Sequence, residues 1–150
     1  MKKHIYLSLT ILCVAFIYNN SLMSAHISST QSALVLNLIQ DAAELVGVSP
    51  KMITEHMVRK LAHFCEFALF GLLLSATIQL WYGNIKAHLY MILFWGLFIP
   101  ISDEFLQLFI AGRTGLVQDV LLDFCGFFVG TVLYIGINFS SKYYKKNRQT

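Results

Sequence analysis

Four stretches of the chain are apolar enough to lie in a lipid bilayer, and this feature constrains the fold more than any other. A membrane-spanning helix needs about 20 mostly apolar residues. The stretches are Ile5–Met23, Leu61–Trp81, Ala87–Ile110 and Val117–Phe139. Only 13% of the residues are charged, whereas soluble domains average about 25%. The sequence therefore predicts an all-α integral membrane protein, a four-span helical bundle, and argues against a soluble enzyme domain.

The charge and the cysteines exclude further classes of protein. A net charge of +3 is too small for a nucleic-acid-binding surface, so we expect no nucleic acid partner. Cys13, Cys65 and Cys125 all lie inside apolar runs without the C-x-x-C spacing of a metal site. We interpret them as free thiols that fill space.

The first apolar stretch allows two interpretations. Its strongly apolar part, Ile5–Tyr18, covers 14 residues after Lys2 and Lys3, which fits either an uncleaved anchor span or a secretory signal peptide. We divide the chain into an N-terminal anchor, residues 1–25, and a helical membrane domain, residues 26–150. Between the first two spans, polar and apolar residues alternate at helical spacing over Gln31–Val46. This pattern predicts a short amphipathic outer helix.

The loops and the basic residues predict the topology. Tyr82-Gly83-Asn84 is so short a turn that the second and third spans must be antiparallel neighbours. Pro100 interrupts the third span, which we expect to continue with a kink. Lys and Arg are more frequent on the side that holds both termini and this turn than on the other side, which places both termini in the cytoplasm.

Ionisable residues recur where the predicted spans should be apolar. Each lies within roughly 10 Å of the outer end of its span at 1.5 Å per residue. An ionised side chain inside a membrane is costly, so such groups pair, face the bundle interior or line a wet cavity. With the basic residues beside them, the members of this polar layer are Arg59, Lys60, His63, Glu66, Asp103, Glu104, Gln107, Arg113, Asp119 and Asp123.

Three interpretations of the polar layer remain open from the residues alone. The first is structural: salt bridges between helices, such as Arg113 with Asp119 or Asp103. The second is a binding or catalytic pocket in which His63 and Glu66 exchange protons while Arg113 or Lys60 contacts an anionic head group. The third is a divalent cation held by His63 and the carboxylates; otherwise we expect no cofactor, and no metal ligand set is assigned.

The same residues resemble the VanZ-like family of small bacterial membrane proteins. The similar strings are Lys60-Leu-Ala-His63-Phe-Cys-Glu66, Ser102-Asp103-Glu104-Phe-Leu-Gln107 and Gly112-Arg113-Thr114-Gly115, followed by Asp119 and the Gly126…Gly130 pair. The resemblance covers roughly residues 51–136. Ala111 stands where the family usually has Pro, and Asp123 where it usually has Asn.

The resemblance implies a multi-span protein of the bacterial cytoplasmic membrane, and its founding member is associated with resistance to teicoplanin-type glycopeptides. We expect the present protein to bind or modify a lipid-linked cell-wall precursor or a lipoglycopeptide at the outer face of the membrane. The competing interpretation is a non-catalytic scaffold, and both the enzymatic nature and the oligomeric state stay open. The candidate catalytic residues are His63, Glu66 and Asp103, and the candidate substrate-binding residues are Lys60, Glu104, Gln107, Arg113 and Asp119.

Overall fold

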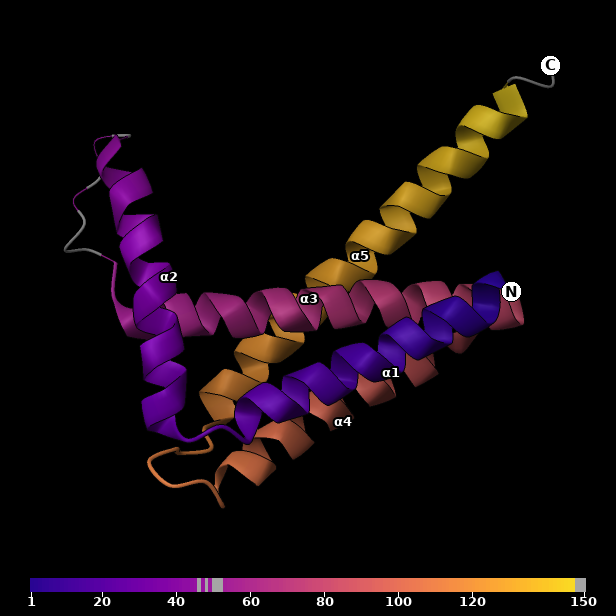
Figure 1. Ribbon diagram of the computed structural model, residues 1–150. Helices are drawn as coiled ribbons and strands as arrows, with labels where there is room; N and C mark the ends of the chain where they lie inside the picture. Colours follow the sequence, from indigo (N-terminus) through magenta and orange to yellow (C-terminus); the bar gives the residue numbers. More distant parts are fainter. Residues whose placement is uncertain (46, 48, 50–52, 148–150) are drawn as a thin grey trace.

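The chain folds into helices that gather around one long central helix. The computed structural model describes residues 1–45, 47, 49 and 53–147, and every regular element in this part of the chain is helical. Figure 1 shows α1 and α4 side by side, close to α3 at the end near the N-terminus and diverging from it at the other, with α5 crossing α3 and α2 leaving it at a steep angle. The elements are α1 Lys2–Ser21, α2 Ala25–Leu45, α3 Glu55–Tyr82, the short 3₁₀ helix η2 Lys86–His88, α4 Leu89–Gln107 and α5 Val117–Asn147.

Among the residues that the structure describes, three helical segments are long and apolar enough to cross a membrane: Glu55–Tyr82, Lys86–Gln107 and Val117–Phe139. The all-helical, multi-pass membrane architecture is therefore confirmed. The predicted four-span count is not, because α1 does not reach the same apolarity over 18 residues. Lys2, Lys3 and Asn20 bracket its 14-residue apolar centre, which is short for a bilayer of about 30 Å. That α1 spans the membrane stays a prediction.

The crossing of α3 and α5 is unusually close because glycines line it. A Cβ atom on Gly130 would overlap the carbonyl oxygen of Ala68, and one on Gly126 would overlap that of Phe64. From the other side, a Cβ on Gly71 would overlap the carbonyl oxygen of Phe127. Small residues permit such backbone contact between membrane helices. Gly126 and Gly130 of α5 thus lie directly against the backbone of α3.

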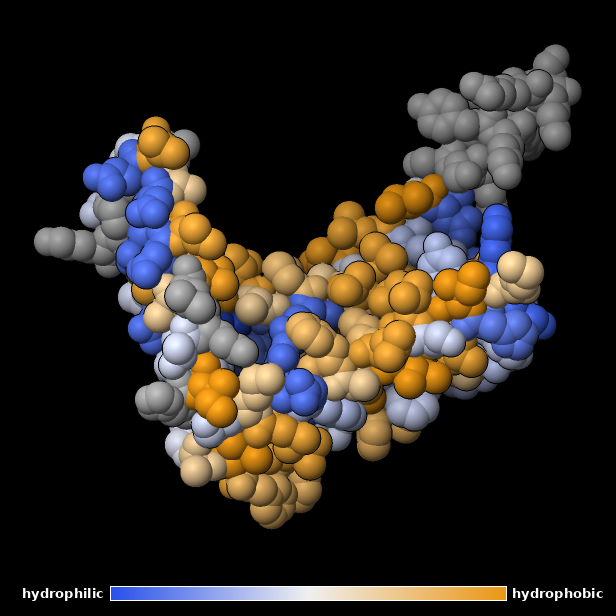
Figure 2. Space-filling view, viewed as in Figure 1, coloured by the Kyte–Doolittle hydropathy of each residue, from blue (hydrophilic) through white to orange (hydrophobic). Residues whose placement is uncertain are grey.

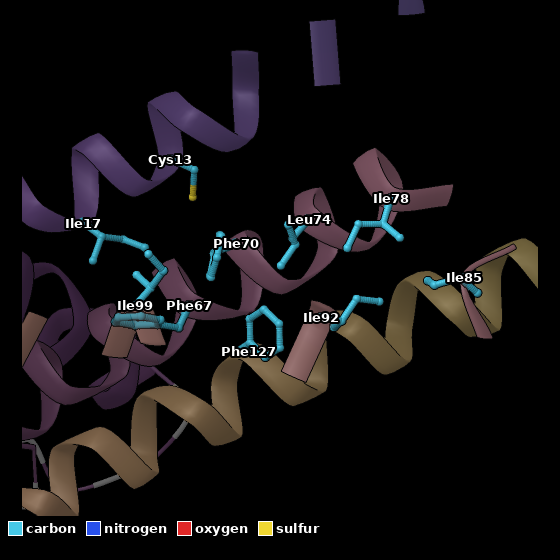
Figure 3. Packing of buried hydrophobic residues seen from close by; sticks show 10 residues of the cluster. All are labelled: Cys13, Ile17, Phe67, Phe70, Leu74, Ile78, Ile85, Ile92, Ile99 and Phe127. Atoms are coloured by element: carbon cyan, nitrogen blue, oxygen red, sulfur yellow. The ribbon is translucent and has the colours of Figure 1, made fainter. Parts of the chain in front are cut away.

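The buried apolar residues form one core along α3. Phe67 and Phe70 of α3 pack with Ile17 of α1, Ile99 of α4 and Phe127 of α5 (Figure 3). On α1 the buried positions are Thr10, Cys13, Ile17 and Ser21, three or four residues apart, so one face of this helix meets the others. The core holds α1 in a fixed position beside the spans.

Local signals explain where the helices begin and end. Thr54 caps α3 by accepting a hydrogen bond from the Met57 N–H, so this helix starts before the predicted Leu61. Gly83 ends it with φ +73°, the left-handed conformation that favours glycine, within the predicted turn. Helix α4 continues through Pro100 as expected but ends at Gln107 rather than near Ile110.

The predicted amphipathic outer helix exists as α2, which begins earlier than expected, at Ala25. Figure 2 shows hydrophilic side chains along the outer side of α2 and hydrophobic ones over much of the remaining surface. On α4, Phe94, Phe98 and Phe105 are among the exposed apolar side chains. In a membrane protein such residues face lipid.

Candidate functional site

The polar layer gathers where α1 ends, α3 begins, α4 ends and α5 begins. There the side chains surround a pocket of about 120 Å³. Its lining includes Lys60, His63, Glu104, Gln107, Arg113, Asp119 and Asp123. Asp103 is fully buried beside it and is hydrogen-bonded to Gln107. The structure thus brings together residues from three helices and a loop, while the roles assigned to them stay predictions.

Asp103 is held from two sides through one of its oxygens. The Ser21 hydroxyl donates to Asp103 Oδ2 at 2.7 Å, and Gln107 Nε2 donates to the same oxygen at 3.1 Å. The other oxygen, Oδ1, is buried and has no hydrogen-bond partner among the described residues. Two donors on one oxygen fix the carboxyl group and leave the second oxygen available.

Glu104 ties the end of α4 to the start of α5. Its Oε2 accepts the Leu116 backbone N–H at 2.9 Å, and its Oε1 accepts from Gln107 Nε2 at 3.1 Å. An acidic group next to the first turn of a helix also interacts favourably with the helix dipole. Glu104 therefore fixes the loop that carries Arg113.

Arg113 binds carbonyl groups rather than carboxylates. Its Nε donates to the Met23 carbonyl at 2.9 Å and one Nη donates to that of Asn20 at 3.1 Å; the other Nη donates to Gln107 Oε1 at 3.4 Å. Burial lowers the pKa of this guanidinium and Arg59 acts in the same direction, whereas nearby carboxylates raise it. Neutral acceptors thus fix the side chain of Arg113, and no contacting carboxylate among the described residues offsets its positive charge at the pocket.

The predicted salt bridge of Arg113 with Asp119 or Asp103 is wrong for the part of the chain that the structure describes. Asp119 is paired instead with Lys60, at 2.7 Å between Oδ1 and Nζ. Lys60 lies about one and a half turns into α3 and reaches the first turn of α5. The carbonyl groups at the end of α1 compete for Arg113 because a helix C-terminus leaves its last carbonyls without partners.

Sequence reasoning missed the two polar residues that end α1. Asn20 Nδ2 donates to Glu66 Oε1 at 2.8 Å, just as Ser21 donates to Asp103. Both residues follow an apolar run directly, so they fit an ordinary helix end at a membrane surface. Asn20 and Ser21 lie more than 40 positions from their partners Glu66 and Asp103. No spacing pattern in the sequence predicts contacts over such separations.

Three side chains from three helices meet below the pocket. His63 of α3, Asp103 of α4 and Asp123 of α5 each offer one ligand atom, and these atoms all lie within 4.8 Å of one another. Of the groups in this layer, they are the residues placed to hold a metal ion.

A model of the VanZ/LLP1 family matches residues 6–139. The chain belongs to the VanZ/LLP1 family. A search of the curated proteins and a search of the solved structures gave no match. The family match reaches well beyond the predicted residues 51–136 and includes α1 and α2. In this VanZ/LLP1 protein, the helix that carries Asn20 and Ser21 thus belongs to the family domain.

A second pocket adjoins the first in the VanZ/LLP1 protein. It has a volume of about 270 Å³ and lies between α2 and α3, with Val35, Ile39, Val58 and Leu61 among its lining residues. Arg59, His63 and Arg113 line both pockets. Glu66 faces the second one. The polar first pocket and the largely apolar second pocket therefore meet at these three basic side chains.

Proposed function

We propose that this VanZ/LLP1 protein acts at the outer face of the bacterial cytoplasmic membrane on an amphiphile with an anionic head group. The ligand class is a lipid-linked cell-wall component or a lipoglycopeptide, and its binding or modification contributes to resistance to teicoplanin-type glycopeptides. The observation that carries the proposal is the pair of adjoining pockets, one polar and one largely apolar, that share Arg59, His63 and Arg113.

The polar pocket suits the head group. Arg113 donates only to neutral oxygens, so its charge is not cancelled by a contacting carboxylate among the described residues. A guanidinium presents paired N–H groups that match phosphate and carboxylate. Lys60 contributes less, because Asp119 already binds its ammonium group. Arg113 is therefore the main anion-binding group in this proposal.

The apolar pocket suits the lipid part of the ligand. Residues of α2 form one wall and residues of α3 the other, and α2 makes its contacts mainly with α3. A helix held at one face can shift to admit a chain between itself and the bundle. The amphipathic α2 would then cover the bound ligand.

Acid–base chemistry is available between the two pockets. His63 Nδ1 and Glu66 Oε2 are both buried without a hydrogen-bond partner among the described side chains. Groups with a free lone pair or proton beside a binding site are candidates for proton transfer. We assign this role to His63 and Glu66, with Asp103 as the third candidate.

The scaffold alternative makes a different prediction, because in it the polar layer only stabilises the bundle. Under the proposed function, His63→Ala and Glu66→Gln abolish glycopeptide resistance conferred on a susceptible host. Membrane abundance and thermal stability should change little in these variants. This expectation is strongest for Glu66→Gln, because glutamine has the same shape as glutamate. Glu55→Gln, on the exposed start of the same helix, is the matched control and should retain resistance. Parallel loss of abundance and resistance in both variants would favour the scaffold.

The orientation can be tested on the loop that carries Arg113. In a chain whose three cysteines are replaced by serine, we expect the exposed Thr114→Cys to react with a membrane-impermeant maleimide in intact cells. Lys86→Cys, in the turn at the other end of the bundle, should react only after permeabilisation. The basic residues near both termini support this orientation. The reverse labelling pattern would place the pockets in the cytoplasm and refute the outer-face proposal.

A further inference from the structure

We propose that His63, Asp103 and Asp123 form a binding site for a divalent transition-metal ion of the Zn²⁺ type. The three ligand atoms lie within 4.8 Å of one another. Neighbouring ligands around a tetrahedral Zn²⁺ ion are separated by about 3.4 Å, because each lies about 2.0–2.1 Å from the metal. Small rotations of the side chains therefore suffice to close the set around an ion.

Each of the three side chains has a buried atom that lacks a partner. These atoms are His63 Nδ1, Asp103 Oδ1 and Asp123 Oδ2, none of which has a hydrogen bond to any described residue. Asp103 and Asp123 are only 0% and 1% exposed. Buried polar atoms are almost always satisfied, and each exception requires a proton, a water or an ion as its partner. An ion bound by these three residues would supply such a partner.

The surroundings of Asp103 are those of a metal ligand. Ser21 and Gln107 donate to Oδ2, which fixes the carboxyl group and leaves Oδ1 to bind. Hydrogen bonds to the far oxygen of a ligating carboxylate orient it in this way. Glu66 accepts a hydrogen bond from Asn20 at Oε1 and is not one of the three proposed ligands. It therefore serves as a control residue for the ligand set.

The charge of the layer favours a doubly charged cation. Its carboxyl groups are Glu66, Asp103, Glu104, Asp119 and Asp123, and its basic side chains are Arg59, Lys60 and Arg113. Three positive and five negative charges leave a net charge of −2. An uncompensated charge inside a membrane protein is unfavourable. A divalent ion would neutralise the layer.

The ligand types select the class of ion. Imidazole nitrogen suits zinc and its neighbours, whereas Mg²⁺ and Ca²⁺ take sets composed of oxygen atoms. Three protein ligands leave a fourth position open, as in catalytic zinc sites. Two of the ligands, His63 and Asp123, also line the polar pocket, so the open position faces the space beside Arg113.

Metal titration of the full-length protein in detergent micelles tests the proposal. After removal of metal with EDTA, we expect calorimetry with ZnCl₂ to give one ion per chain, and MgCl₂ to bind at least tenfold more weakly. Zinc should also raise the melting temperature, because an ion that binds only the folded protein stabilises it. The absence of stoichiometric zinc binding, or tighter binding of magnesium, would overturn the proposal.

Isosteric variants locate the site. Asp123→Asn, Asp103→Asn and His63→Gln should each weaken zinc binding at least tenfold and abolish the zinc-dependent rise in melting temperature. His4→Gln and Asp41→Asn, both exposed, are matched controls that should bind zinc as the wild type does. Wild-type affinity in any folded variant of the triad would remove that residue from the site and overturn the ligand set.

His63 and Asp103 belong to both proposals, and with a metal ion bound they would act as ligands rather than as proton-transfer groups, so Glu66 is the residue that separates the metal site from the proposed lipid function. Glu66→Gln should lose resistance yet keep its zinc affinity within a few fold, since Glu66 is not a ligand. Zinc binding that persists while no variant affects resistance would support the metal site and contradict the lipid proposal.

Discussion

Gly130→Ala should remove most of the folded protein from the membrane. The new Cβ atom would overlap the backbone carbonyl of Ala68, and α3 cannot move away without opening the core around Phe67 and Phe70. Overpacking of this kind costs about 3 kcal/mol, against a total stability of about 5–15 kcal/mol for typical domains. Such a loss lowers cellular abundance several-fold. Quantitative blotting of membranes, with thermal melting in detergent, measures it.

The same helix provides the control for this substitution. Gly136 lies two turns further along α5, and nothing lies within 4 Å of a Cβ atom placed on it. Gly136→Ala should therefore leave abundance unchanged or raise it slightly, because alanine favours a helix by up to about 1 kcal/mol over glycine. Equal melting temperatures for the two variants would show that α3 and α5 do not cross at Gly130.

Arg113→Ala should be the most damaging substitution in the polar layer. It removes the donors to the Asn20 and Met23 carbonyls and takes a cation away from buried carboxylates. A hydrogen bond to a charged group contributes about 1.5–3 kcal/mol, and this substitution removes several of them. We expect a large fall in melting temperature in detergent, with resistance lost as well. Arg113→Lys keeps the charge but not the forked geometry, so its melting temperature should lie between those of Arg113→Ala and the wild type.

Arg59→Ala separates this effect from a general loss of positive charge. Arg59 lines the same two pockets, but it forms a long hydrogen bond of 3.4 Å with the exposed His56. Its removal should change the melting temperature little. If Arg113→Ala melted at the same temperature as Arg59→Ala, the bonds to the end of α1 would not contribute to stability.

Hydropathy and spacing predicted most of the architecture. The apolar stretches gave α3, α4 and α5, and Gly83 marked the turn between two of them. Depth along each span was enough to bring Glu66, Asp103 and Asp119 into one layer, because neighbouring antiparallel helices share the same membrane surface. Such predictions depend on the distance between two residues along a helix, which follows from the number of residues between them.

The partners of the charged groups could not be predicted in the same way. Arg113 binds backbone carbonyls, and every residue has one, so no side-chain pattern announces this contact. Ser21 and Asn20 act only because the packing of Ile17 places the end of α1 against α3 and α4. The meeting of His63 with Asp123 depends likewise on the rotation of α5 about its axis, which the close contacts of Gly126 and Gly130 determine.

The hydrogen bonds of Arg113 also set an order for biosynthesis. They join Asn20 and Met23 to a residue made 90 or more positions later, after α3 and α4 have been synthesised. Until then the carbonyls at the end of α1 have no guanidinium to bind, and the carboxyl groups of Glu66 and Asp103 lack this cation. The polar pocket is therefore completed late in translation. Nascent chains that stop before Arg113 would carry the carboxyl groups of Glu66 and Asp103 without this guanidinium. Membrane quality-control proteases would encounter the chain in that incomplete state.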